Sequence, residues 1–242
     1  MIEYLKKTFN GSEAEFHAVA TKALEEEKKL FVVTANPETM MIARSNEDFH
    51  KALVDEATTI VPDGIGVVKG MNSLDIKTNG RVTGVGLCSH LFKEGSCLKK
   101  SVYLYGAKPE VNDKLCEVLK KDCPDLRIVG HKNGYDNDPD EVFEDMKKLE
   151  PDIVLVALGI PKQELLIYKN LNDFKKGIFV GVGGSFDVLS GTKKRAPKLF
   201  VKLNLEWLYR IAGDPKRIKR FYQSNVKFFS VLKKEKKAAK KA

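Results

Sequence analysis

The sequence has 242 residues, of which 43% are hydrophobic, and a formal net charge of +9. A chain of this size and composition can bury one sizeable core or two small ones, which excludes a disordered protein. No apolar run approaches the roughly 18 to 20 residues of a membrane span, and the polar N-terminus is unlike a signal peptide, so we expect a cytoplasmic protein.

The positive charge is concentrated in the C-terminal segment. Residues 193–242 hold 17 of the 42 Lys and Arg but only 3 of the 33 Asp and Glu, so this segment carries +14 and the remainder −5. Such a segment suits phosphate groups, either those of lipid headgroups or those of nucleic acid. The four cysteines have neither zinc-binding nor disulfide-framework spacing, and we interpret them as reduced.

Short β-rich runs alternate with segments of helical period along most of the chain. Strands are predicted at 30–34, 58–61, 101–105, 126–130, 152–158 and 177–183. Between them, residues 13–29 and 108–122 each place apolar side chains on one helical stripe. This alternation predicts an α/β fold with a mainly parallel sheet and helices on both faces, as in a Rossmann-like core.

The helix predicted within residues 136–152 has clear end signals. Asp138 is its expected N-cap and Pro139 its first residue, with acids in the first turn and lysines in the last. Asp136 and Asp138 also resemble the D-x-D metal motif of many nucleotide-sugar transferases, but we prefer the capping role for Asp138. The four histidines lack metal-ligand spacing. We also expect no cofactor.

The composition changes after Gly191. Two amphipathic basic helices, interrupted at residues 213–215, are predicted there, and the final lysines are expected to form a solvated, disordered tail. We therefore predict a core over 1–192 and a basic helical appendage over 193–242. Its interleaved aromatic and basic residues suit an anionic membrane surface. Alternatively, its apolar stripe packs on the core or on another subunit.

Ligands of parallel α/β sheets bind beyond the carboxyl ends of the strands. The loops that follow the predicted strands offer the polar residues Asn36, Asp63, Gln163 and Asp187 and the glycines Gly106, Gly159, Gly183 and Gly184. Each glycine alone also fits a tight turn, but together these loops favour a nucleotide site. The sequence lacks an intact G-x-G-x-x-G, a P-loop motif and G-x-S-x-G, which argues against dinucleotide enzymes, NTPases and hydrolases.

Longer motifs carry a resemblance to a known family. They are "TANPETMMIA", "PDGIGVV", "GRVTGVGL", "YLYGAKPEV", "GIPKQE", "GVGGSFDVLSGTKKRAP" and "LEWLYRIAGDPKRIKRF". In order and spacing they resemble the WecG/TagA/CpsF family of bacterial glycosyltransferases, from about residue 30 to 222. The resemblance implies a self-associating enzyme at the inner face of the cell membrane, which transfers a sugar with inversion and without a required metal.

The resemblance also implies the substrates. The donor is often UDP-N-acetylmannosamine and the acceptor is N-acetylglucosamine on undecaprenyl diphosphate, in teichoic acid or related polysaccharide synthesis. Another hexose as the donor sugar stays open. Two other classes are weighed on the residues alone: a nucleic-acid-binding α/β protein, which lacks RNP, KH and helix-turn-helix signatures, and an NAD-linked oxidoreductase, which lacks the glycine fingerprint.

The resemblance assigns roles to individual residues. Asp63 corresponds to the proposed general base, although an Asp-Gly pair can also simply bend the chain. Thr34 and Asn36 lie beside the reacting sugar, and Asn36 can also start the next helix. Arg81 and Thr83 face the acceptor or the diphosphate, although Arg81 can instead form a surface ion pair.

The remaining roles concern the nucleotide and the appendage. Gln163 and the backbone of Gly183 and Gly184 resemble the nucleotide-binding parts of the family, and Gly106 and Gly159 are further candidates for phosphate approach. Asp187 either accepts a ribose hydroxyl or caps a helix. Three arginines of the appendage are expected to reach the active site when it closes: Arg210, Arg217 and Arg220.

Overall fold

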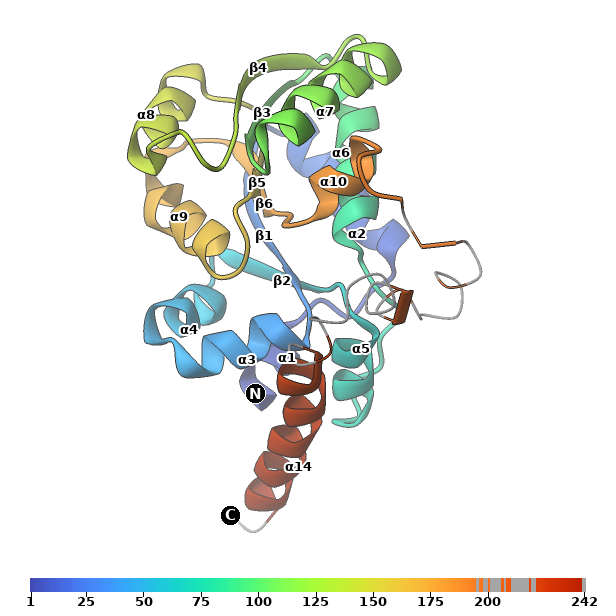
Figure 1. Ribbon diagram of the computed structural model, residues 1–242. Coiled ribbons are helices and arrows are strands. Elements are labelled where there is room, and N and C mark those ends of the chain that lie inside the picture. Colours follow the sequence, from blue (N-terminus) through green and yellow to red (C-terminus); the bar gives the residue numbers. More distant parts are fainter. Residues whose placement is uncertain are drawn as a thin grey trace.

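The computed structural model describes residues 1–194, 196–197, 200, 206, 208–209, 218 and 221–240. Its centre is a six-stranded parallel sheet with the strand order β2-β1-β6-β5-β3-β4 (Figure 1). The strands are β1 (Lys29–Ala35), β2 (Thr58–Pro62), β3 (Ser101–Gly106), β4 (Arg127–Lys132), β5 (Ile153–Ala157) and β6 (Gly177–Gly181). Every predicted strand is present, which confirms the α/β fold class.

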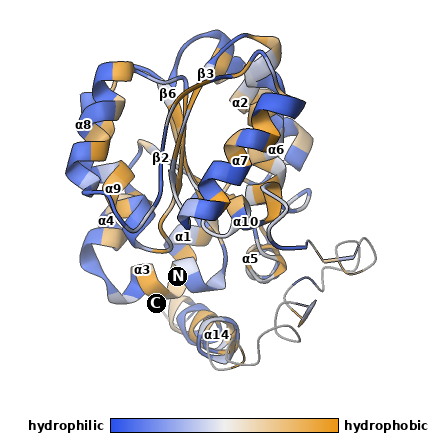
Figure 2. Ribbon diagram, turned by 45° about the horizontal axis from the view of Figure 1, so that its top comes forward, coloured by the Kyte–Doolittle hydropathy of each residue, from blue (hydrophilic) through white to orange (hydrophobic). Residues whose placement is uncertain are grey.

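Helices cover both faces of this sheet. They are α1 (Ile2–Lys7), α2 (Glu13–Glu25), α3 (Pro37–Ser45), α4 (Glu47–Val54), α5 (Ile65–Asn72), α6 (Gly84–Cys97), α7 (Pro109–Asp122), α8 (Pro139–Leu149), α9 (Lys162–Asn170), α10 (Ser185–Leu189) and α14 (Lys227–Ala239). Figure 2 shows α4, α8 and α9 on one side of the strands and α2, α6 and α7 on the other. No helix in the described part of the chain is both long and apolar enough to span a bilayer.

Two hydrophobic clusters, one on each face, hold these layers together. Successive strand residues point to opposite faces, so on β3 the side chains of Tyr103 and Tyr105 enter one cluster while Val102 and Leu104 enter the other. Because both faces are covered, the central strands are apolar at nearly every position. That is why runs of β-branched residues were sufficient to find them.

The residues at the helix N-termini form caps of the kind that the sequence indicates. Ser12 begins α2 with a capping box, in which its side chain accepts from Glu15 N and the Glu15 carboxylate accepts from Ser12 N. Asp138 caps α8 by accepting hydrogen bonds from Asp140 N at 2.8 Å and Glu141 N at 3.2 Å. The capping interpretation of Asp138 is therefore confirmed.

The final lysines do not form the disordered tail that we expected. Residues Lys227–Ala239 form the regular helix α14, which continues from a π-helical turn over Tyr222–Val226. Phe228 and Leu232 of this helix are buried in a core cluster with residues of α1, α3 and α5. Of the two helices predicted on either side of residues 213–215, the first lies largely outside the described residues, and the second is present from Tyr222 onward as the π-helical turn and α14.

Polar contacts reinforce the position of α14. The Glu235 carboxylate accepts from Ile2 N at 3.2 Å and from Arg44 Nε at 3.3 Å, and Lys236 donates to the carbonyl of Ser73. The apolar stripe of this helix therefore packs on the core, as the alternative interpretation had it. The division into a core over 1–192 and an appendage over 193–242 stays a prediction.

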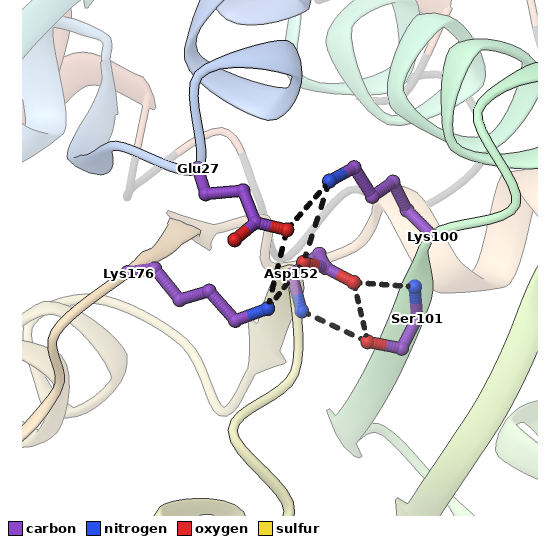
Figure 3. Close-up of polar contacts among 5 residues, drawn as sticks. All are labelled: Glu27, Lys100, Ser101, Asp152 and Lys176. Carbon is purple, nitrogen blue, oxygen red and sulfur yellow. Dashed lines mark hydrogen bonds and ion pairs between the residues drawn. The ribbon is translucent and has the colours of Figure 1, made fainter.

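A buried carboxylate joins three strands at the amino edge of the sheet, opposite the loops that were expected to bind ligand (Figure 3). Asp152 is 5% exposed and accepts from Ser101 N at 2.9 Å, Ser101 Oγ at 2.7 Å and Lys176 Nζ at 2.9 Å. Burial alone would raise the pKa of Asp152, but the hydrogen bonds from Lys176 and Ser101 outweigh burial and lower it. Lys100 and Glu27 complete the cluster on its exposed side.

We expect Asp152→Asn to lower the free energy of unfolding by about 2 kcal/mol at pH 7, because charge-assisted hydrogen bonds to a buried group are lost. A carboxylate with a lowered pKa stabilises the folded state above its ordinary value of 3.8 and loses that effect as the pH falls. The difference between wild type and variant should therefore shrink below about pH 4. Urea unfolding at pH 7 and at pH 3 measures both values.

Glu27→Gln is the matched control for this prediction. Glu27 contacts Lys100 at 3.0 Å and Lys176 at 3.7 Å, but its side chain is 55% exposed. Removing its charge should therefore leave the free energy of unfolding nearly unchanged, because solvent screens its ion pairs. An equal loss of unfolding free energy in the two variants would show that burial does not make the contacts of Asp152 more stabilising than those of Glu27.

Candidate active site

A cavity of about 740 Å³ lies at the carboxyl ends of β1, β2, β5 and β6. Ten of the predicted site residues line it: Thr34, Asn36, Asp63, Arg81, Thr83, Gly159, Gln163, Gly183, Gly184 and Asp187. Gly106 does not line it, although its neighbour Ala107 does. Arg210, Arg217 and Arg220 lie outside the described residues. The topology thus gathers loops that are up to about 150 positions apart in sequence, as the rule for parallel sheets requires.

Asp63 stands directly after β2, and its carboxylate turns toward the cavity. Its N–H donates to Ala35 O at 2.9 Å, which extends the pairing of β2 with β1. Its Oδ1 accepts from Gly84 N at 3.2 Å, the first residue of α6. The next helix, α5, has Gly64 as its N-cap. The carboxylate therefore sits at the positive end of the α6 dipole, which stabilises negative charge there.

Asn36 both begins a helix and faces the cavity. Its Oδ1 accepts from Glu38 N at 2.8 Å and Thr39 N at 3.1 Å, so it is the N-cap of α3. The capping role left open by the sequence is therefore real. Among the described residues its Nδ2 has no hydrogen-bond partner and can donate to a ligand. Thr34 lies beside it on β1 and donates to Gly181 O at 3.1 Å.

Arg81 and Thr83 form the wall that leads into α6. Arg81 Nη1 lies 3.4 Å from Glu206 Oε2, and the two side chains are only 16% and 15% exposed. Arg81 therefore does form an ion pair, as the alternative interpretation had it. The pair, however, is largely buried at the cavity and does not lie on the open surface. Thr83 caps α6 by accepting from Gly86 N at 3.1 Å.

Sequence reasoning missed Glu13, which holds Thr83 in place from α2. Its Oε1 accepts from Thr83 N at 3.1 Å and from Thr83 Oγ1 at 3.0 Å. The same oxygen would lie 2.5 Å from a Cβ at position 86, so Gly86 leaves room for it. In the sequence, Glu13 looks like an ordinary acidic residue in the first turn of a helix. No local pattern indicates its contact with Thr83, which lies 70 positions later.

In the described part of the chain, four helices of eight or more residues begin at the cavity wall. They are α3, α5, α6 and α9, whose first-turn residues Pro37, Ile65, Gly84 and Gln163 all line it. Each helix N-terminus carries a partial positive charge and N–H groups directed outward. Several such ends converging on one cavity favour the binding of an anion such as a diphosphate.

The geometry agrees with comparisons to known proteins. The model of the Glycosyl transferase WecG/TagA/CpsF family matches residues 3–242. The chain belongs to this family. A curated relative, the N-acetylglucosaminyldiphosphoundecaprenol N-acetyl-beta-D-mannosaminyltransferase of Bacillus spizizenii, is 39% identical over 220 residues, which cover 91% of this chain and 85% of the relative.

Two further relatives carry the same enzyme name. That of Bacillus subtilis strain 168 is 37% identical over 205 residues, with 85% of this chain and 80% of the relative covered. That of Staphylococcus aureus strain MW2 is 36% identical over 211 residues, with 87% and 83% covered. The family resemblance drawn from the sequence motifs is thereby confirmed.

The cavity also contains an aromatic residue, Tyr135, which sequence reasoning missed. It lies in the loop between β4 and α8, lines the cavity and is 70% exposed. The loop is fixed at Asn133, whose Oδ1 accepts from Tyr135 N at 2.8 Å and Asp136 N at 3.0 Å. An exposed ring at such a rim can stack on a nucleobase. The signal was available, because this loop also follows a predicted strand.

Asp187 does not cap a helix, so that alternative is wrong. Gly184 is the N-cap of α10, and Asp187 lies within the helix. It lines the cavity, and its Oδ1 contacts Lys193 Nζ at 2.8 Å. The role as a ribose partner stays a prediction.

Among the described residues, no group of three or more His, Cys, Asp and Glu side chains could hold a metal ion.

Proposed function

We propose that this chain transfers N-acetylmannosamine from its UDP donor to N-acetylglucosamine carried on undecaprenyl diphosphate, with inversion at the anomeric carbon. The relatives named for transfer of N-acetyl-β-D-mannosamine to N-acetylglucosaminyldiphosphoundecaprenol support the substrates. The observation that carries the chemistry is the Asp63 carboxylate at the edge of a cavity toward which four helix N-termini converge. The product would be a lipid-linked disaccharide for teichoic acid or a related surface polysaccharide.

Asp63 would act as the general base. Inverting transfer needs one carboxylate to take the proton of the acceptor hydroxyl while that oxygen attacks the anomeric carbon. The bond to UDP breaks as the new glycosidic bond forms, and the proton ends on Asp63. The hydrogen bond from Gly84 N fixes one carboxylate oxygen. The Asn36 amide nitrogen nearby is placed to hold a sugar hydroxyl or acetamido group.

The departing diphosphate would be stabilised by the cavity wall. The N-termini of α3, α5, α6 and α9 supply partial positive charge, and Arg81 supplies a guanidinium in the same wall. Tyr135 would hold the base. Arg210, Arg217 and Arg220 are proposed to add charge when the C-terminal segment closes, and Phe221, Ser224 and Asn225 of that segment already line the cavity.

The decisive test offers a panel of UDP-hexoses with a synthetic N-acetylglucosamine diphospholipid acceptor, with and without EDTA. We expect a disaccharide lipid with UDP-N-acetylmannosamine in both conditions. A product formed only with another hexose would move the chain to a different branch of the family. Absence of any product, with saturable UDP binding intact, would contradict the proposed acceptor.

The C-terminal helix is proposed to bind the inner surface of the cell membrane. The exposed side of α14 carries Lys233, Lys234 and Lys237, together with Phe229, which is 39% exposed, and the exposed Lys240 is the C-cap of this helix. A basic helix with exposed aromatic residues suits anionic headgroups. Self-association of the chain stays a prediction.

The two other classes of function lose their support. The basic segment that suggested nucleic acid is partly a helix packed on the core, and the family is one of glycosyltransferases. The same family match leaves no reason to expect an NAD-linked oxidoreductase. A different hexose as the donor sugar remains the alternative that the panel above resolves.

A further inference from the structure

Glu164 is a buried carboxyl group that the proposed chemistry does not use. It follows Gln163 in the first turn of α9 and is 1% exposed. Its Oε1 accepts from Gln163 Nε2 at 2.7 Å, while its Oε2 has no hydrogen-bond partner in the described part of the chain. Burial raises the pKa of Glu164 to about 7, against the lowering effect of the hydrogen bond from Gln163. A group that costs this much to bury needs a reason to be there.

The partner of Glu164 connects two loops of the active site. Gln163 is 2% exposed, and its Oε1 accepts from Gly159 N at 3.0 Å and from Gly183 N at 3.1 Å. Gly159 lies in the loop after β5 and Gly183 in the loop after β6, both at positive φ. One amide oxygen therefore sets the distance between two backbone segments that form the cavity wall.

The orientation of the Gln163 amide decides whether this connection exists. A side-chain amide can rotate by half a turn and exchange its oxygen and nitrogen with almost no change in shape. In the exchanged orientation, the NH₂ group would face two backbone N–H donors, and both hydrogen bonds would be lost. The Glu164 oxygen adds to the preference for the observed orientation, because it accepts from the NH₂ side.

We propose that Glu164 is a positioning residue: by fixing the Gln163 amide, it holds the Gly159 and Gly183 loops in the shape that receives the nucleotide diphosphate. This inference rests on the proposed function for the identity of the ligand. An apolar residue in place of Glu164 would pack without a desolvation cost but would remove the hydrogen bond that holds the NH₂ side of the Gln163 amide. Burial of the carboxyl group thus lowers the stability of the protein, while its hydrogen bond defines the geometry of the loops.

Gly181 at the end of β6 supports the same arrangement from the opposite side. A Cβ at this position would lie 2.8 Å from Gln163 Nε2 and 2.9 Å from Glu164 Oε1. Both contacts are too short, so a side chain here would push the two groups apart. The backbone of Gly181 tolerates other residues, since its φ is not positive. Its small size is therefore needed for the hydrogen bond between Gln163 and Glu164.

The test compares Glu164→Leu with Glu164→Gln. The Leu variant removes the acceptor, and we expect UDP to bind about tenfold more weakly while the melting temperature stays equal or rises. The Gln variant can still accept from Gln163, so UDP affinity should stay within about threefold of wild type. Calorimetric titration with UDP and thermal unfolding give these values. UDP affinity of the Leu variant within twofold of wild type, or an equal loss in both variants, would overturn the proposal.

A second measurement needs no ligand and therefore separates this inference from the proposed function. In ligand-free protein, hydrogen exchange at the Gly159 and Gly183 amides should become about tenfold faster in Glu164→Leu and stay unchanged in Glu164→Gln. Gly181→Ala should speed exchange at both glycines as Glu164→Leu does, although Gln163 and Glu164 themselves are not substituted. Unchanged exchange at both glycines in the Leu variant would show that Glu164 does not fix the amide, whatever the protein binds.

Discussion

Asp63→Asn is expected to lower the turnover number about 100-fold or more while UDP affinity stays within about threefold of wild type. Asparagine has nearly the same shape, and its oxygen can still accept the hydrogen bond from Gly84 N. It cannot take a proton from the acceptor hydroxyl. The turnover number at saturating donor and acceptor, together with calorimetric titration of UDP, separates loss of chemistry from loss of binding.

Asp187→Asn is the matched control, because Asp187 is a second carboxylate on the same cavity rim. If Asp187 binds the ribose, the change should raise KM for the donor and leave the turnover number within several-fold. Comparable loss of turnover in both variants would point to a general need for negative charge at the rim. Full turnover in Asp63→Asn would remove Asp63 from the mechanism.

Replacing Lys233, Lys234, Lys237 and Lys240 by Gln is expected to weaken binding to vesicles of anionic phospholipid about 1000-fold. Each basic residue near such a surface contributes about 1 kcal/mol, so four contribute about 4 kcal/mol. All four side chains are exposed, three of them on α14 and that of Lys240 at its C-cap. Lys236 is left unchanged because it donates to the Ser73 carbonyl and holds the helix on the core. Vesicle sedimentation at increasing lipid concentration measures the change.

The control for this set carries the same change of charge at the other end of the molecule. Lys114, Lys120, Lys121 and Lys148 are exposed on α7 and α8, which Figure 1 places away from α14. Their replacement by Gln should change vesicle binding far less, and UDP affinity should be unaffected in both sets. Equal losses would indicate a general effect of net charge. Deleting residues 193–242 is the less informative experiment, because Phe228 and Leu232 belong to the core.

The fold and the location of the site could be predicted because both follow from local patterns. Strands buried on both faces are continuous apolar runs, and a carboxylate or amide directly after such a strand must lie at the ligand-binding edge. Asp63, Asn36 and Gln163 were found in this way. The cap at Asp138 was found from its own neighbours and the following Pro139.

The parts that sequence reasoning missed depend on contacts between distant segments. Glu13 holds Thr83 from 70 positions away, and Asp152 joins strands through Ser101 and Lys176. The lysine-rich composition of the C-terminus concealed α14, because two buried side chains, Phe228 and Leu232, decide its position. A short apolar stripe within a basic segment carries little weight in the sequence, but it is decisive once a core is present to receive it.

The place of β6 in the sheet has a consequence for synthesis of the protein. This strand is the last of the six in the chain, yet it lies between β1 and β5 near the middle of the sheet. Until residues 177–181 leave the ribosome, the nascent chain can form only the pair β1–β2 and the three-stranded unit β5–β3–β4, each with an unprotected apolar edge. Such edges invite association between unfinished chains and contact with chaperones. The two halves join, and the cavity at the carboxyl ends of their strands first exists, only after residues 177–181 have been translated.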